Sequence, residues 1–142
     1  VQTLMSNWFD LSSDHLGFQL GVNRVSNNLS HLRGVVANES ISVECECKCD
    51  PGERGYVYTI FGVAVGDIHI CPDAFEQGLN GLARTLIHEM THKYLQTADN
   101  GYYDPKFDIY MDENGSNITL SPSQLMENAD TYSHMIRQEF FE

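Results

Sequence analysis

The feature that most constrains this chain is an amphipathic stretch, residues 73–96, that carries two histidines four residues apart, His88 and His92. Its apolar residues recur with the period of an α-helix, which predicts one helix with a buried face. That face comprises Leu79, Leu82, Ala83, Leu86 and Met90. At about 100° per residue, both histidines lie nearly opposite this face, with Glu89 at its flank. The helix is therefore expected to bury one side and to direct both imidazoles elsewhere.

The spacing His88-Glu89-Met-Thr-His92 is typical of a catalytic zinc site. Histidines four residues apart on a helix lie one above the other and can bind the same zinc ion. Zinc lowers the pKa of a bound water and polarises a carbonyl, and the glutamate after the first histidine can accept the water's proton. Together these groups permit amide hydrolysis. The alternative is a pair of solvated surface histidines.

A catalytic zinc ion normally takes three protein ligands. A third histidine six residues beyond His92 would mark one large class of peptidases, but Ala98 occupies that position. The remaining candidates for the third ligand are Asp99, Glu127, Asp130 and His134.

The segment that follows the helix resembles the aspzincin family, the deuterolysins and peptidyl-Lys metalloendopeptidases. That family continues its zinc helix with Gly-Thr-x-Asp-x-x-Tyr-Gly. Thr97, Asp99 and Tyr102 match, whereas Gln96 and Tyr103 replace the two glycines. Residues 68–75 resemble the family's strand ending in Cys and an aromatic, and residues 127–132 resemble its Asn-Ala-Asp segment. The likeness covers residues 55–135.

The resemblance implies one zinc ion bound by His88, His92 and Asp99, with Glu89 as general base and then proton donor. Tyr102 would hydrogen-bond the oxyanion of the tetrahedral intermediate. Tyr103 is the alternative for that role, and Asp99 could instead be only a turn residue.

Asp130 inherits, by the same resemblance, a place near the pocket for the residue after the cleaved bond, consistent with a basic residue there. Lysine-specific members carry a second acid three residues later, where this chain has Ser133. The alternative for Asp130 is a carboxylate on the helix surface, paired with Arg137 or with water.

The fold expected is α+β and zincin-like, a single domain over residues 1–142. Two N-terminal helices separated near Ser12 and Ser13 precede a small, mostly antiparallel sheet with strands at 41–45, 55–61 and 67–71. The zinc-binding helix, a long polar loop over 100–120 and a C-terminal helix follow. That helix begins at Ser121, and its apolar stripe includes Leu125, Ala129, Tyr132, Ile136 and Phe140.

Acidic residues outnumber basic ones by 20 to 8, which gives a net charge of −12. Such a surface repels phosphate backbones, so nucleic acid is excluded as a partner, whereas a cationic substrate would be attracted. The acidity could also serve solubility alone. Apolar runs are shorter than the roughly 18 residues that a membrane helix needs, so no membrane insertion is expected.

The four cysteines are Cys45, Cys47, Cys49 and Cys71. An even number in a short chain allows two disulfides, with three possible pairings, and favours a secreted or extracellular setting. A thiolate metal site is the alternative. The chain begins at Val1 without a leader, which suggests a processed product or an excised domain.

The function predicted is that of a zinc-dependent endopeptidase acting on a protein or peptide substrate. One alternative keeps this chemistry in the toxin end of a larger secreted bacterial effector, which would have a cognate inhibitor or immunity protein. Another is a non-enzymatic zinc-binding or adhesion domain. Glu89 argues against the latter, because zinc binding alone does not require it.

Overall fold

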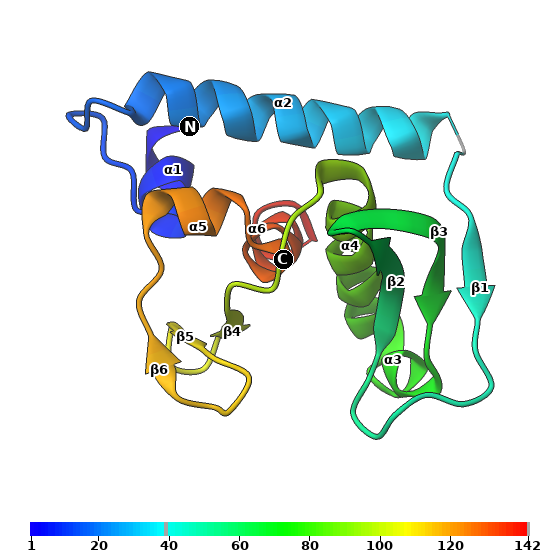
Figure 1. The fold of residues 1–142 in the computed structure, drawn as a ribbon. Coiled ribbons are helices and arrows are strands. Elements are labelled where there is room, and N and C mark those ends of the chain that lie inside the picture. The colour runs from blue at the N-terminus through cyan, green and yellow to red at the C-terminus, as the bar shows by residue number, and fades with distance from the viewer. Residues whose placement is uncertain (39, 142) are drawn as a thin grey trace.

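The computed structural model describes residues 1–38 and 40–141. Two helices begin the chain, α1 (Gln2–Phe9) and α2 (Phe18–Ala37), and their separation confirms the expected interruption. Figure 1 shows α2 extending across one side of the molecule, where it contacts both α4 and α5. The apolar stripe of α2, which includes the buried Val25 and Leu32, faces the core.

The first sheet contains β1 (Val43–Cys45), β2 (Gly55–Ile60) and β3 (Val63–Ile70), in the order β1-β3-β2. β1 pairs with β3 in parallel, and β2 pairs with β3 in antiparallel orientation. Ile68 and Ile70 alternate with His69 on β3 and pack against Leu82 and Leu86 of the following helix. The three strands confirm those predicted at 41–45, 55–61 and 67–71, although β3 begins four residues earlier than expected, at Val63. β2 is an edge strand beside that helix.

The stretch predicted as a single zinc helix is divided into α3 (Pro72–Glu76) and α4 (Gly78–Leu95). Gly78 has a φ of 70°, a left-handed conformation that ends α3. The predicted buried face was wrong for Leu79, which is 84 % exposed, and for Ala83. Because α4 is enclosed between the first sheet and α6, its other side is buried as well.

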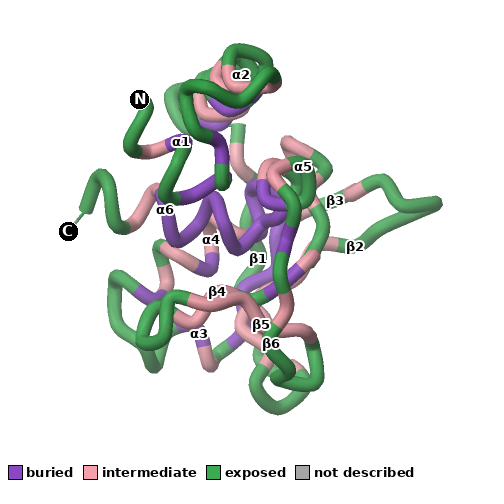
Figure 2. The backbone as a smooth tube through the Cα atoms, turned by 90° about the vertical axis from the view of Figure 1, so that its left-hand side faces the viewer, coloured by how far each residue is buried: buried purple, intermediate pink, exposed green. Residues whose placement is uncertain are grey.

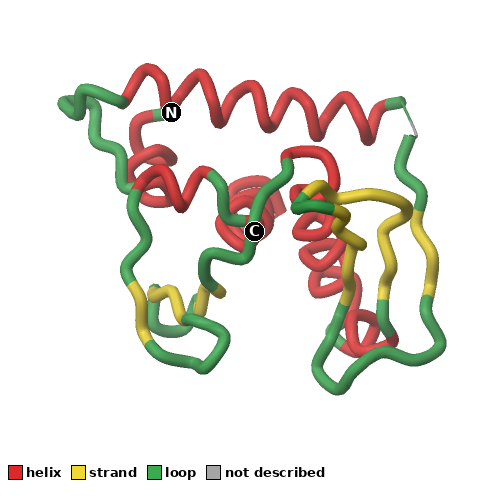
Figure 3. The backbone as a smooth tube through the Cα atoms, in the orientation of Figure 1, coloured by secondary structure: helices red, strands yellow, loops and turns green. Residues whose placement is uncertain are grey.

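The polar stretch predicted as a loop contains a second sheet, of β4 (Tyr102–Asp104), β5 (Ile109–Met111) and β6 (Asn117–Ile118), paired antiparallel. Strands of two or three residues are too short to show an alternating pattern, which is why the sequence did not reveal them. Figure 3 shows this sheet and the first one on separate sides of the central helices.

The predicted C-terminal helix is also divided, into α5 (Pro122–Met126) and α6 (Ala129–Phe141). Ser121 caps α5 by accepting a hydrogen bond from the backbone N–H of Gln124, as expected. α6 lies at the centre of the molecule, where Figure 2 shows an almost continuous buried segment. The buried apolar stripe of α6 ends before Phe140, which was predicted to belong to it, because Phe140 is exposed.

The architecture confirms the α+β class, and three of the four strand pairings are antiparallel. Two apolar clusters form the core, one around α1, α5 and α6, the other between the first sheet and α4, and Ile136 packs against both. In the part of the chain described, no helix has the length and apolar character to cross a membrane.

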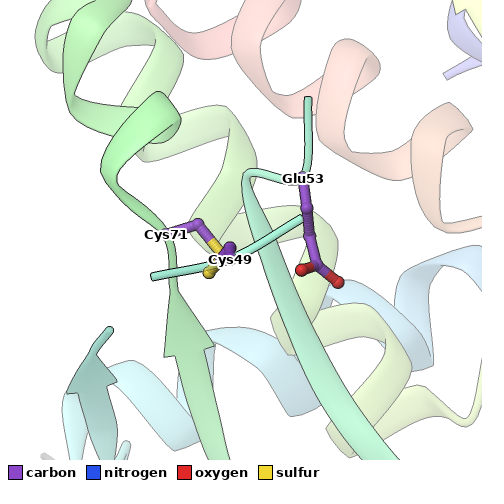
Figure 4. Close-up of side chains that lie close together, drawn as sticks. All are labelled: Cys49, Glu53 and Cys71. Atoms are coloured by element: carbon purple, nitrogen blue, oxygen red, sulfur yellow. A yellow bond between two sulfur atoms is a disulfide. The ribbon is translucent and has the colours of Figure 1, made fainter. Parts of the chain in front are cut away.

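A single disulfide joins Cys49 to Cys71 and ties the loop before β2 to the end of β3, with Glu53 beside it (Figure 4). Cys45 and Cys47 are free and exposed, so the expectation of two disulfides was wrong for this pair. Alternate residues of an extended chain lie about 6.6 Å apart, near the upper limit for a disulfide.

Replacing Cys49 and Cys71 together by serine is expected to lower the free energy of unfolding by about 3 kcal/mol, because the bond closes a loop over a sequence separation of 22 residues. Urea denaturation measures the change. The matched control is the Cys45→Ser, Cys47→Ser pair, expected to stay within about 0.5 kcal/mol of the parent. Equal stability of all three proteins would contradict the pairing.

Candidate metal centre

Three side-chain atoms converge at one end of α4. The Nε2 atoms of His88 and His92 are 3.1 Å apart. Asp99 Oδ1 lies 3.1 Å from Nε2 of His88 and 3.3 Å from Nε2 of His92. Both histidines are partly buried, and they line a cleft with a volume of about 880 Å³.

The other nitrogen of each imidazole is held from behind. His92 Nδ1 is 2.9 Å from the backbone oxygen of Thr97, and His88 Nδ1 is 3.3 Å from Oδ1 of Asp130. Both partners are acceptors, so each imidazole carries a hydrogen on Nδ1, and in the neutral ring that a metal ion requires the Nε2 lone pair points toward the cleft. This arrangement orients histidines for metal binding.

The donor set fits a zinc ion. Tetrahedral zinc with bonds of about 2.0–2.1 Å places its ligand atoms about 3.3 Å apart, close to the separations found here. Burial lowers the pKa of His88, but hydrogen bonds with Asp130 and Asp99 outweigh it and raise the pKa to about 9. The raised pKa means that the surrounding carboxylates stabilise a positive charge on the imidazole.

The other candidates for the third ligand lie elsewhere. Glu127 is exposed and pairs with Arg24 at 2.9 Å. His134 Nε2 is 3.0 Å from Nη1 of Arg84. Two further groups of possible ligands exist among the described residues, one at Glu44, Glu46 and His69, the other at the disulfide, whose sulfurs are not thiolates.

The turn that brings Asp99 to the histidines keeps its shape without a glycine. Gln96 ends α4 with φ 54° and ψ 38°, the left-handed conformation that glycine usually supplies. Its side chain accepts a hydrogen bond from the backbone N–H of Ala64, which fixes it against β3. The departure from the family's glycine therefore leaves the turn intact.

Asn128 holds the next part of that turn. It is completely buried, and its Oδ1 accepts the backbone N–H groups of Asn100 and Gly101. Its Nδ2 donates to the oxygen of Gly101 and to Oγ1 of Thr131. A backbone bridge between Ala98 and Asn128 adds to these bonds. Sequence reasoning saw Asn128 only as part of a motif and did not anticipate this role.

Glu89 is buried on α4 and lines the cleft beside the histidines. The first residue of β2, Gly55, makes room for it: a Cβ there would lie 3.1 Å from Glu89 Cγ and 3.0 Å from the backbone oxygen of His69. Burial raises the pKa of Glu89, while His88 and His92 oppose the change. A carboxylate with a raised pKa is a better proton acceptor.

The two tyrosines of β4 have different surroundings. Tyr102 is 41 % exposed and lines the cleft, and burial together with the nearby Asp99 raises its pKa, so its hydroxyl is a donor at neutral pH. The hydroxyl of Tyr103 donates to Asp108 at 2.6 Å, and its ring packs against Trp8. Asp108 therefore occupies the hydroxyl of Tyr103 but not that of Tyr102.

Asp130 is buried at the start of α6, contrary to the alternative of a surface carboxylate. Besides His88, it contacts Nη1 of Arg84 at 3.4 Å and accepts the backbone N–H of Tyr103. Burial raises its pKa, but the hydrogen bond to His88 and the charge of His134 outweigh this, and the net shift is downward. Its carboxylate therefore lies behind His88, at the wall of the cleft.

Comparison with known proteins identifies the family. The family model described as lysine-specific metallo-endopeptidase, the aspzincin model, matches residues 2–135. The chain belongs to the aspzincin family. Its fold is similar to that of a zinc peptidase from Grifola frondosa, with a TM-score of 0.68 and 19 % identity over 98 % of this chain and 78 % of that one. No curated protein matches the chain.

The family establishes the broad activity class of this aspzincin, that of a metallo-endopeptidase acting on proteins or peptides. The structural likeness confirms the expected zincin-like α+β fold. In addition, the structure of this chain shows which of its side chains lie together at one end of the cleft.

Asn128→Ala is expected to lower the free energy of unfolding by about 2–4 kcal/mol, because it leaves buried backbone groups of the 98–101 turn without partners. Zinc affinity should fall with it. The matched control is Asn100→Ala, whose exposed side chain makes one bond to the backbone oxygen of Gln124. Thermal unfolding and zinc titration measure both effects, and equal behaviour of the two variants would contradict the role of Asn128.

Asp99→Ala should remove most of the zinc that the wild-type protein retains after dialysis, because it takes away one of the three converging donor atoms. Metal analysis should find about one zinc ion per wild-type chain. Asp104→Ala, in the same cleft but outside the converging group, serves as the control and should keep its zinc. Full zinc retention by the Asp99 variant would move the third ligand elsewhere.

Proposed function

We propose that this chain is a zinc-dependent endopeptidase in which His88, His92 and Asp99 bind one catalytic zinc ion. The observation that supports this most directly is the convergence of the three donor atoms within 3.3 Å of one another, beside Glu89, in a cleft. When bound there, zinc would polarise the scissile carbonyl and acidify the attacking water.

Two side chains supply the remaining chemistry. Glu89 accepts the proton of the attacking water and afterwards delivers it to the leaving amine, a role that suits a buried carboxylate with a raised pKa. Tyr102 donates its hydroxyl hydrogen to the oxygen of the former carbonyl, where negative charge develops. The free edge of β2 borders the same cleft, so an extended peptide can lie along it.

Asp130 acts in this proposal as a positioning residue, because its carboxylate holds the hydrogen-bearing nitrogen of His88. The preference for a basic residue after the cleaved bond, expected from the family resemblance, stays a prediction. Ser133 occupies the position at which lysine-specific members carry a second acid, and its hydroxyl donates to the backbone oxygen of Asp130.

A secreted or extracellular location suits the disulfide between Cys49 and Cys71, since disulfides persist in oxidising compartments. The toxin alternative, with its inhibitor or immunity protein, involves the same site chemistry and differs only in what the domain is attached to. The non-enzymatic alternative makes Glu89 dispensable, and this separates it from the proposal.

Glu89→Gln is expected to lower kcat/KM on a denatured protein substrate by about 10²–10⁴-fold while zinc content stays unchanged, because the amide cannot accept the proton. The matched control is Glu76→Gln, the same chemical change at an exposed position of α3, which should keep full activity. Unchanged hydrolysis by the Glu89 variant would refute the catalytic assignment, and loss of zinc would assign Glu89 to the metal site instead.

A further inference from the structure

The hairpin formed by β2 and β3 exposes a group of large apolar side chains at its far end: Tyr58, Ile60, Phe61 and Val63. Phe61 is fully exposed, and each of the other three is exposed over more than half of its surface. Figure 2 shows the end of this hairpin extending beyond the rest of the molecule. Single exposed apolar residues are common, but a group of them on one projecting element indicates an interaction surface.

The turn of the hairpin holds an aromatic residue in an unfavourable conformation. Ile60 pairs with Val63, so Phe61 and Gly62 form a two-residue turn, with φ of 50° and 78°. Such turns favour asparagine, aspartate or glycine at the first position, because a Cβ is disfavoured where φ is positive. Burial within this chain does not offset the strain, since Phe61 is exposed. A contact with another molecule explains Phe61 better than the stability of the turn does.

The side chains of the hairpin alternate between two faces. Thr59 lines the cleft. On the other face, the ring of Tyr58 lies 5.3 Å from that of Tyr56 and 5.1 Å from that of His69. These ring contacts hold Tyr58 in place, and Ile60 follows it on the same face, which we call the outer face of the hairpin. Tyr58 and Ile60 therefore form a preformed apolar surface on the side away from the cleft.

A peptide in the cleft can reach this surface because β2 is an edge strand that also borders the cleft. A peptide that extends the sheet pairs its backbone with β2 and directs alternate side chains to the two faces. Those on one face point into the cleft, and those on the other lie beside Tyr58 and Ile60. Apolar and aromatic neighbours on adjacent strands stabilise such pairing.

Gln96 connects the hairpin to the metal centre. Its Oε1 accepts the backbone N–H of Ala64 at 2.9 Å, and its Nε2 donates to the backbone oxygen of Lys93 at 2.8 Å. The glycine that the family carries at this position has no side chain to form either bond. The side chain of Gln96 therefore fixes the hairpin relative to the end of α4 and the turn that carries Asp99.

The charges around the outer face favour a peptide over a lipid surface. Glu44 and Glu46 lie 3.6 Å and 2.7 Å from Nδ1 of His69 on that face, and the whole chain has a net charge of −12. An anionic membrane surface would be repelled. A peptide with both basic and apolar residues complements the acidic charge and the apolar hairpin together.

We propose that the outer face and tip of the β2–β3 hairpin, with Tyr58, Ile60 and Phe61, bind apolar side chains of the substrate at a distance from the cleaved bond. This inference rests on the proposed function and names a further substrate requirement of the same site. From Gly55, beside Glu89, to Ile60 an extended strand covers about 17 Å, so these side chains lie about three to five residues from the bond. A lysine at the bond itself is compatible with this contact.

The test uses acetylated and amidated peptides with one central lysine, the residue named in the family's description. Phe or Ser is placed in turn at each of the second to sixth positions on either side, and mass spectrometry locates the cut. On one side of the cut, kcat/KM for Phe should exceed that for Ser by about 5–20-fold at every second distal position, because alternate side chains face the hairpin. Equal rates at all distal positions would overturn the proposal.

Phe61→Asn and, independently, Ile60→Thr should bring the Phe-to-Ser ratio toward one, with zinc content and cleavage of the Ser peptides unchanged. Asparagine is favoured at this position of the turn and threonine in a strand, so both variants keep the hairpin. The matched control is Phe140→Asn, the same change at an exposed position of α6, which should keep the ratio of the wild-type protein. A ratio that survives both hairpin substitutions would refute the assignment.

Two other occupants of the hairpin would also overturn the proposal. Binding of the wild-type protein to phosphatidylcholine vesicles, lost in Phe61→Asn while the peptide ratio is one throughout, would assign the hairpin to lipid. A dimer seen by sedimentation, dissociated by Phe61→Asn with the same flat peptide profile, would assign it to a second copy of the chain.

Binding separates this inference from catalysis. Calorimetry on the Glu89→Gln variant, which should hold peptides without cleaving them, compares the Phe and Ser peptides. Binding of a Phe peptide about fivefold tighter or more, lost when Phe61→Asn is added, would support the hairpin site even if the wild-type protein cleaved nothing. In that case the proposed function alone would fail, whereas equal binding of the two peptides would overturn the inference.

Discussion

The packing of α4 against α6 is the contact on which the rest of the site depends. α4 carries the two histidines, and α6 begins with the residues that complete their surroundings: Asn128 just before it holds the 98–101 turn, and Asp130 in its first turn holds His88. A histidine pair on an isolated helix would rotate freely. Here one helix carries the donor atoms and the other sets their orientation, so metal geometry and helix packing form one cooperative unit.

A buried carboxylate and partly buried imidazoles are costly unless their charges and hydrogen bonds are matched. At this site the matching is arranged in layers. Asp99 faces both Nε2 atoms, Asp130 and the Thr97 carbonyl face the Nδ1 atoms, and Arg84 faces Asp130 from the far side. Negative and positive groups therefore alternate outward from the centre, which stabilises the arrangement.

The sequence by itself determined the features that depend on local spacing. The histidine pair and its glutamate follow from helical periodicity around His88, the strands expected at 55–61 and 67–71 from their alternating or β-branched residues, and the cap of α5 from Ser121. The strands found span 55–60 and 63–70. It also placed Asp99 through a motif that survives the loss of its glycine, because Gln96 adopts the same left-handed conformation.

Only the tertiary structure decided the contacts between residues that lie far apart in the chain. Leu79, in the first turn of α4, is exposed although the helical pattern placed it on the buried face. The short strands of the second sheet formed by pairing rather than by propensity, and Cys45 and Cys47 found no disulfide partner among the described residues. The contact of Asn128 with the 98–101 turn belongs to the same class, because its partners Asn100 and Gly101 lie 28 and 27 positions away in the chain. Long-range packing brings such residues together, and no periodicity in a single sequence records it.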